Sequence, residues 1–171
     1  VHYSLPTPVT EPFDPKTGEP QFSEANVRKL TKHLSEDIGL RLVGTEQCDA
    51  AEKYLVREIK QLKEEAKRVA ARGDIQGLPN FELWVQVEDG SHRFDFMSKV
   101  VMKTYTNMTN IIVRLSCGPE CDDNAILLNA HFDTTLGSPG ATDDGLGVGV
   151  LMEIIRIMSI QSAPKKNSVI F

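Results

Sequence analysis

One histidine and three aspartates lie close together within residues 129–147. His131 and Asp133 are two residues apart, so on an extended chain their side chains point the same way. Asp143 and Asp144 follow across a loop rich in Gly and Pro. An imidazole and a carboxylate gathered in one place are ligands that a divalent metal such as zinc takes in proteins. The spacing therefore predicts a metal site in which His131 and Asp143 are ligands and Asp133 holds the second ring nitrogen of His131.

Each of these patterns has an ordinary structural interpretation when it is taken alone. A His-x-Asp pair is most often a surface or core hydrogen bond, and two aspartates before a helix most often cap it. A nucleotide-binding loop at residues 145–149 is a poor fit, because the glycine spacing is wrong and the preceding aspartates would repel a pyrophosphate. Ser138 lacks the Gly-x-Ser-x-Gly context of a hydrolase nucleophile. The order of strand, His-x-Asp, Gly/Pro loop, Asp-Asp-Gly and apolar helix is far more specific than any single pattern.

The elements that must position these side chains are two strands and the helix between them. Residues 125–128 are an apolar run that predicts a buried strand, and residues 144–159 predict a buried helix. A second strand is expected at residues 167–171. Two strands joined by a helix favour a parallel, right-handed crossover. Ligands of such sheets lie beyond the carboxyl ends of the strands, where His131 falls.

The preceding chain predicts an arm and two helices. Five of the nine prolines lie in residues 1–22, which predicts an extended arm. Ser23 and Thr45 are each expected to cap an amphipathic helix, and Gly39 is placed to end the first helix. Residues 23–171 are expected to form the rest of a single α/β domain.

Alternating apolar and polar residues predict a hairpin after the second helix. Residues 81–88 and 92–97 each alternate as a half-buried strand does. Asp89-Gly90 between them is a turn signal. A third strand is expected at residues 110–116.

Two further features depend on the cellular compartment. Cys117 and Cys121 bracket a short turn. A local disulfide is one outcome in an oxidising compartment, and two free thiols are the other. Asn107-Met-Thr109 is an N-glycosylation acceptor if the chain enters the secretory pathway.

Composition excludes several classes of protein. The chain has 171 residues, 40% of them hydrophobic, and a net charge of −5, which suits a single packed domain and disfavours a nucleic-acid groove. The longest apolar stretch, residues 148–160, is short and is interrupted by Glu153 and Arg156. A membrane anchor is therefore expected outside this sequence.

The motifs together resemble the di-zinc exopeptidases. This family includes bacterial leucyl aminopeptidases and, with closer similarity, membrane-anchored metallopeptidases of the endoplasmic reticulum and the fungal vacuole. The resemblance is carried by His131-Phe-Asp133-Thr, Ser138-Pro-Gly-Ala and Asp143-Asp144-Gly, with weaker matches at residues 22–25, 38–45 and 105–112. It implies an α/β fold with a three-layer mixed sheet and helices on both faces. It also implies two zinc ions, with His131 on one, Asp143 bridging both and a cis peptide bond between Asp143 and Asp144.

The function that the resemblance implies is zinc-dependent hydrolysis of peptide substrates, of the aminopeptidase type. The implied location is the lumenal side of the endoplasmic reticulum or vacuolar membrane. In this family a Glu-Glu pair, a further Asp and a late His follow the next strand, whereas this sequence stops at Phe171. It is therefore expected to be the N-terminal piece of a catalytic domain, inactive alone because the general base and three ligands are absent. The alternative is a non-peptidase relative, either a single-zinc cyclase or a metal-free receptor or scaffold.

Overall fold

The computed structural model describes residues 5–73, 75–164 and 166–171, so that residues 1–4 of the predicted arm lie outside the described residues. Two of its elements are π-helical segments and carry the letter η. In chain order the elements are α1 (Glu24–Lys32), η1 (His33–Ile38), α2 (Glu46–Arg72), β1 (Asn80–Phe96), β2 (Lys99–Ser116), α3 (Pro119–Asp122), β3 (Ala125–Leu127), η2 (Ala141–Gly145), α4 (Leu146–Ser159) and β4 (Ser168–Ile170).

Both predicted helix caps are present. The side-chain oxygens of Ser23 and Thr45 each accept a hydrogen bond from the backbone amide three residues further on. Each bond satisfies an amide that has no partner within its own helix. The first helical stretch ends at Gly39, whose positive φ of 84° suits a residue without a Cβ atom.

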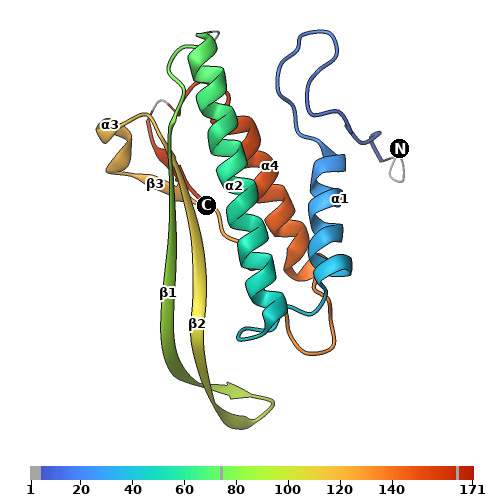
Figure 1. Ribbon diagram of the computed structural model, residues 1–171. Coiled ribbons are helices and arrows are strands. Elements are labelled where there is room, and N and C mark those ends of the chain that lie inside the picture. The colour runs from blue at the N-terminus through green and yellow to red at the C-terminus, as the bar shows by residue number, and fades with distance from the viewer. Residues whose placement is uncertain (1–4, 74, 165) are drawn as a thin grey trace.

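The four strands form one mixed sheet in the order β1-β2-β4-β3. β1 pairs with β2 and β2 with β4 in antiparallel fashion, whereas β3 and β4 are parallel and are connected through α4. The predicted parallel connection is therefore confirmed. Helices α1, α2 and α4 lie side by side on one face of this sheet (Figure 1). The core between helices and sheet is apolar and includes Leu34, Leu55, Val113, Leu115, Met152 and Ile155.

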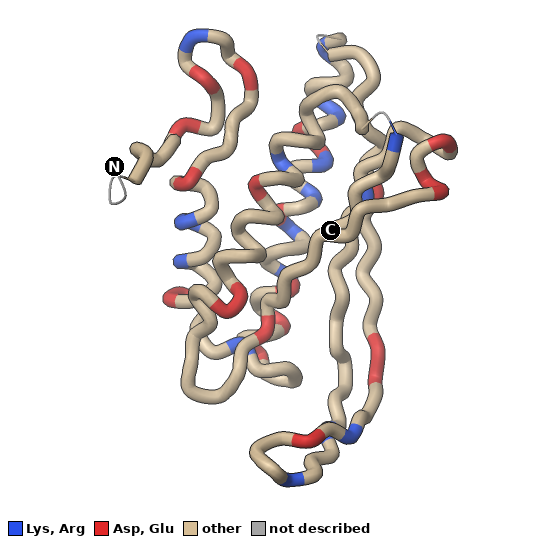
Figure 2. The backbone as a smooth tube through the Cα atoms, turned by 180° about the vertical axis from the view of Figure 1, so that it is seen from behind, with Lys and Arg blue, Asp and Glu red and all other residues tan. Residues whose placement is uncertain are grey.

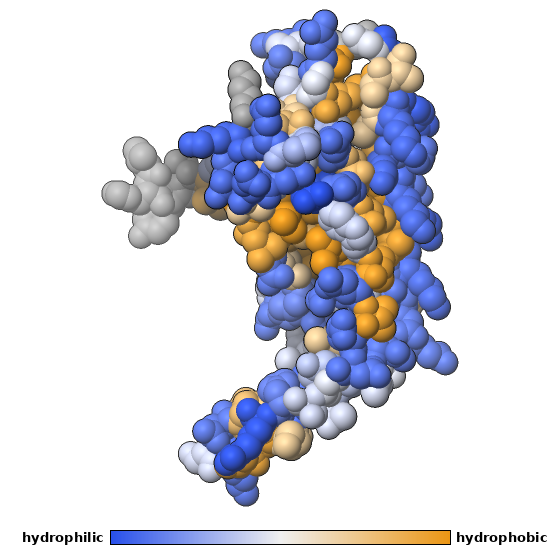
Figure 3. Space-filling view, turned by 90° about the vertical axis from the view of Figure 1, so that its left-hand side faces the viewer, coloured by the Kyte–Doolittle hydropathy of each residue, from blue (hydrophilic) through white to orange (hydrophobic). Residues whose placement is uncertain are grey.

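The opposite face of the sheet carries apolar side chains beside the Glu82–Arg114 ion pair, and it lacks a long helix among the described residues. Trp84, Ile112 and Leu127 occupy this face, and Trp84 is 42% and Leu127 68% exposed. Apolar side chains gather in the middle of the side shown in Figure 3. The α/β class and the mixed sheet agree with the prediction, and the described residues supply one of the two helical layers that a three-layer architecture needs.

The strand predicted at residues 125–128 is present as β3, but it is exposed rather than buried. Ile126 is 54% exposed. The reason is its position, because β3 is last in the strand order and has a neighbour on one side only. The apolar run correctly indicated a strand and did not indicate its place at an edge.

β1 and β2 form one long hairpin that projects from the body of the molecule (Figure 1). Its turn lies at residues 97–98. The sequence analysis predicted the turn at Asp89-Gly90, and that prediction was wrong. A β-bulge interrupts the ladder at Asp89-Gly90, since one residue of β1 faces two of β2 there. The Asp89 carboxylate accepts a hydrogen bond from the backbone amide of Asn107, which has a positive φ of 54°. This bond stabilises the irregular backbone, so that the strand continues through the turn signal.

The described part of the Pro-rich arm is held by two charged residues of α4. The Arg156 guanidinium donates hydrogen bonds to the backbone carbonyls of Pro12 and Gln21 and lies over the Phe13 ring, 5.5 Å from its centroid. The buried Glu153 carboxylate binds the same guanidinium at 2.7 Å. The arm therefore packs on the domain through a buried ion pair.

Charged residues of both signs follow one another along α2 (Figure 2), and most of them are exposed. Lys67 Nζ, for example, lies 2.6 Å from Glu64 Oε1. This is the pattern of a solvated helix face. In the described residues, none of the helices combines the length and the apolar character needed to cross a membrane.

Candidate metal centre

The three predicted site residues lie where the chain leaves β3 and enters α4. His131 and Asp133 belong to the loop after β3, and Asp143 belongs to η2. The backbone of η2 departs from helical geometry at Asp143, with φ −129° and ψ 85°. The peptide bond between Asp143 and Asp144 is cis, as the family resemblance implies.

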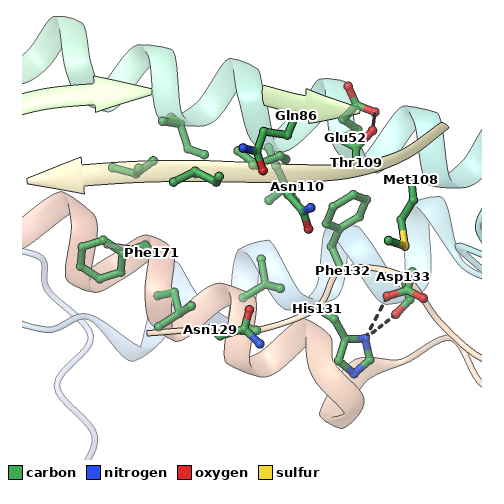
Figure 4. Close-up of a pocket in the computed structure, with 18 of the residues that line it drawn as sticks. Glu52, Gln86, Met108, Thr109, Asn110, Asn129, His131, Phe132, Asp133 and Phe171 are labelled. Carbon is green, nitrogen blue, oxygen red and sulfur yellow. Dashed lines mark hydrogen bonds and ion pairs between the residues drawn. The ribbon is translucent and has the colours of Figure 1, made fainter. Parts of the chain in front are cut away.

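The structure brings the three side chains into contact. His131 Nε2 lies 3.0 Å from Asp143 Oδ1. His131 Nδ1 lies 3.2 Å from Asp133 Oδ1 and 3.0 Å from the Asp133 backbone oxygen (Figure 4). The side chains of His131, Asp133 and Asp143 are 48%, 38% and 81% exposed. One ring nitrogen thus faces the predicted metal-binding carboxylate, and the other faces the predicted orienting residue.

Electrostatics around His131 favour a positive charge at the ring. Partial burial lowers the pKa of His131, but the hydrogen bond to Asp143 and the contacts with Asp133 raise it more, so that the pKa lies above its ordinary value. A divalent cation between His131 Nε2 and the Asp143 carboxylate would bind both of these groups. An imidazole and a carboxylate are common zinc ligands. The residues present therefore fit the metal.

The ligand set within the described residues is small. They contain no group of three or more His, Cys, Asp or Glu side chains arranged to hold a metal ion. His131 and Asp143 form a pair, with Asp133 behind the ring. The geometry thus provides two candidate ligands and one carboxylate that could orient the ring.

The two adjacent aspartates have different contacts. Asp144 Oδ1 accepts a hydrogen bond from the backbone amide of Gly147 at 3.2 Å, which is a capping contact in the first turn of α4. A Cβ atom at Gly147 would meet the Asp144 carboxylate, so a side chain there would require this carboxylate to move from its capping position. Asp143 takes no part in this cap, and its carboxylate faces His131 instead.

Arg41 is a functional candidate that the sequence analysis did not single out, although it lies within the weaker family match at residues 38–45. Its side chain is fully buried, with 0% exposure. It contacts backbone on both sides of the candidate site and donates hydrogen bonds to the carbonyl oxygens of Leu34, Gly39, Phe132, Pro139 and Gly140. One feature of the sequence could have indicated a buried role for Arg41, because it is flanked by leucines in a loop that otherwise lacks charge.

A cavity of about 460 Å³ opens beside His131. It extends between α2, the sheet and α4, with His131 at one end and Phe171 at the other (Figure 4). Apolar side chains such as Ile59 and Val148 line most of it, and Glu52 and Asn110 add polar groups. The site therefore adjoins a space large enough for part of a small ligand.

The structure also describes the cysteine pair and the glycosylation acceptor triplet that the sequence analysis identified. A disulfide joins Cys117 and Cys121, and Cys48 is the free cysteine of the described residues. Asn107 is exposed at the bulge of β2. Thr109, the third residue of the acceptor triplet, donates a hydrogen bond from Oγ1 to Glu52 at 2.9 Å.

Comparison with known sequences identifies relatives of this chain. The sequence model of peptidase family M28 matches residues 110–171, the segment that contains His131, Asp133 and Asp143. A Schizosaccharomyces pombe protein named endoplasmic reticulum metallopeptidase 1 is 44% identical over 171 residues, which is 99% of this chain and 20% of that protein. The chain thus spans about one fifth of the length of this curated relative.

Solved structures share the fold at lower sequence identity. The LapA aminopeptidase of Legionella pneumophila superposes with a TM-score of 0.64 and 18% identity, over 88% of this chain and 34% of that one. A glutaminyl cyclase of Porphyromonas gingivalis superposes with a TM-score of 0.57 and 24% identity, over 88% and 45% of the two chains. Peptidases and cyclases therefore share this arrangement of helices and strands.

Proposed function

We propose that the full-length protein is a zinc-dependent metallopeptidase that hydrolyses peptides in the aminopeptidase manner, because the sequence model of peptidase family M28 matches residues 110–171. The observation that carries the proposal is the 3.0 Å approach of His131 Nε2 to Asp143 Oδ1 within the segment that matches the family. The 44% identity to a protein named as a metallopeptidase supports it.

Each of the three residues has a distinct role in this proposal. His131 and Asp143 hold zinc, and Asp143 bridges two ions. Asp133 fixes the His131 ring so that Nε2 faces the metal, which is the usual task of a carboxylate behind a histidine ligand. Zinc bound there supplies Lewis-acid polarisation of the scissile carbonyl and activation of water. The remaining ligands and the general base are assigned to residues outside 1–171.

The first test is the zinc content of the full-length protein. We expect two zinc ions per chain, and we expect removal of the metal by a chelator to abolish hydrolysis of aminoacyl substrates. Elemental analysis of the purified protein measures the first quantity, and a peptidase assay before and after readdition of zinc measures the second. Peptide hydrolysis that is unaffected by complete metal removal would contradict the proposal.

The alternative is a single-zinc cyclase, favoured by the superposition on a glutaminyl cyclase. One zinc ion per chain, together with cyclisation of a peptide that begins with glutamine, would establish it. A metal-free receptor or scaffold would bind no zinc at all. The His131 and Asp143 side chains argue against that third outcome, because an imidazole and a carboxylate, both of them common zinc ligands, lie 3.0 Å apart there.

We further propose that the protein lies on the lumenal side of the endoplasmic reticulum or vacuolar membrane. The Cys117–Cys121 disulfide supports this placement, since disulfides persist in oxidising compartments. The relative named for the endoplasmic reticulum supports it as well. The exposed Asn107 triplet is accessible for glycosylation there.

Glycosylation at Asn107 is tested by substitution in the native host. We expect Asn107→Gln to remove one glycan from the full-length protein, visible as a single step to lower apparent mass and therefore to faster electrophoretic migration. Thr109→Ala should give the same step because it destroys the same acceptor triplet. Asn110→Gln, an exposed asparagine outside the triplet, is the matched control and should leave mobility unchanged. Equal mobility of wild type and Asn107→Gln would show that this triplet is not used.

A further inference from the structure

Arg41 contacts both ends of the loop that separates the two candidate zinc ligands. Its Nε donates to the Phe132 carbonyl at 2.7 Å, immediately after His131. Its Nη1 and Nη2 donate to the carbonyls of Pro139 at 2.8 Å and Gly140 at 3.2 Å, shortly before Asp143. One guanidinium therefore contacts the chain directly after His131 and again three residues before Asp143.

The same guanidinium ties this loop to the first helical stretch. Nη1 also donates to the carbonyls of Gly39 at 2.7 Å and of Leu34, at the end of η1. The Arg41 backbone adds a reciprocal pair with Thr134, because its amide donates to Thr134 Oγ1 at 2.9 Å and its carbonyl accepts from the Thr134 amide at 3.0 Å. The loop after Asp133 is thus fastened by backbone and side chain together.

The contacts of Arg41 differ from those of an ordinary structural ion pair. Among the described residues no carboxylate lies within salt-bridge distance of it, and all five acceptors of its side chain are neutral backbone carbonyls. A buried charge is costly unless its hydrogen-bonding groups are satisfied. The planar guanidinium presents five N–H groups in a fixed fork, which is why arginine and not lysine can serve so many acceptors at once.

Gly140 packs closely against the guanidinium. Gly140 has a φ of +60°, and a Cβ atom there would lie 2.5 Å from Thr134 Cγ2 and 3.1 Å from Arg41 Nη2. The backbone of Gly140 can approach the guanidinium only because it carries no side chain. The positions of Phe132 and Gly140 relative to each other are therefore set by Arg41.

We propose that Arg41 is a positioning residue of the metal centre. It fixes the separation of His131 and Asp143 by binding both ends of their connecting loop, and it thereby sets the affinity for zinc without contacting the metal or the substrate. This inference rests on the proposed function, because it assigns Arg41 a role toward the zinc that His131 and Asp143 hold.

The test compares zinc affinity with thermal stability in variants of the full-length protein. Zinc affinity is measured by competition with a chromophoric chelator, well below the unfolding temperature. We expect Arg41→Ala to weaken zinc binding by about 10- to 100-fold, the range known for partners that orient metal ligands. Arg41→Lys keeps the charge but not the fork, so a smaller loss of zinc affinity is expected with a smaller drop in Tm.

Glu153→Gln is the matched control. Glu153 is also buried and also belongs to a charged network, but that network binds the N-terminal arm and not the site loop. We expect this variant to lower the Tm and to leave the zinc affinity of the folded protein unchanged. The contrast separates a positioning role from a contribution to stability alone.

Three results would count against these assignments. Wild-type zinc affinity in folded Arg41→Lys and Arg41→Ala would overturn the positioning role and leave the proposed function intact. An equal loss of zinc in Glu153→Gln, at an equal drop in Tm, would also overturn it, since zinc release would then follow from general destabilisation. A wild-type protein that binds no zinc would refute the proposed function itself.

Discussion

Replacing His131 or Asp143 with alanine is expected to reduce kcat/KM of the full-length protein for an aminoacyl substrate by more than about 100-fold. Loss of a residue that only orients a metal ligand reduces activity by about 10- to 100-fold, and loss of a ligand itself should reduce it further. Both side chains are at least 48% exposed, so neither truncation leaves a cavity in the core. The variants should therefore fold with nearly wild-type stability and should contain less zinc.

Two substitutions of the same types control for this experiment. His92→Ala and Asp95→Ala alter exposed residues of the projecting hairpin, away from the candidate ligands, and should retain wild-type kcat/KM and zinc content. Asp133→Ala should give an intermediate loss of about 10- to 100-fold at most. Its backbone carbonyl remains 3.0 Å from His131 Nδ1 and continues to orient the ring. Normal hydrolysis by His131→Ala with zinc still bound would refute the assignment of His131 as a ligand.

Local signals account for the parts of the fold that the sequence predicted correctly. The caps at Ser23 and Thr45 depend on a hydrogen bond that spans three residues, so sequence neighbours suffice to identify them. The parallel pairing of β3 and β4 follows from the length of the helical connection. The proximity of His131 and Asp143 follows from the same topology, because both residues lie between the carboxyl end of β3 and the start of α4, before the helix carries the chain back toward the amino ends of the strands.

The features that the sequence did not predict depend on partners distant in the chain. Asp89-Gly90 continues a strand because Asn107, on the opposite strand, donates its amide to Asp89. β3 is exposed because of its place in the strand order, which an apolar run cannot reveal. Arg41 binds backbone carbonyls of residues 132–140, and carbonyls carry no sequence signature. The side chains suited to chemistry could be predicted, whereas the residue that positions them could not.

The same distinction applies to Glu153 and Arg156. In the sequence they interrupt an apolar stretch and argue only against a membrane span. In the structure their side chains are 3% and 14% exposed and form an ion pair at 2.7 Å. Glu153 also accepts hydrogen bonds from the Ser23 amide at 2.8 Å and from Asn26 Nδ2 at 3.1 Å. One carboxylate thus joins α4 to the start of α1 and, through Arg156, to the arm.

Glu153→Ala is therefore expected to destabilise the domain by about 3–5 kcal/mol, because it leaves the Arg156 charge buried without its carboxylate partner. At roughly 2–4 °C per kcal/mol for a domain of this size, the lower figure corresponds to a drop in Tm of about 6–12 °C. Differential scanning calorimetry of the full-length protein measures this shift. Limited proteolysis should also cut the arm of the variant faster, since Arg156 then holds residues 12 and 21 less firmly.

Glu64→Ala is the control for this prediction, because it removes a glutamate that pairs with a lysine at 2.6 Å but is 61% exposed. An exposed pair contributes at most about 1 kcal/mol, so the expected change in Tm is a few degrees or less. If Glu153→Ala lowered the Tm no more than Glu64→Ala, the buried pair would have no greater energetic weight than a surface pair. The arm would then be attached to the domain mainly through its backbone hydrogen bonds and the contact of Phe13 with Arg156.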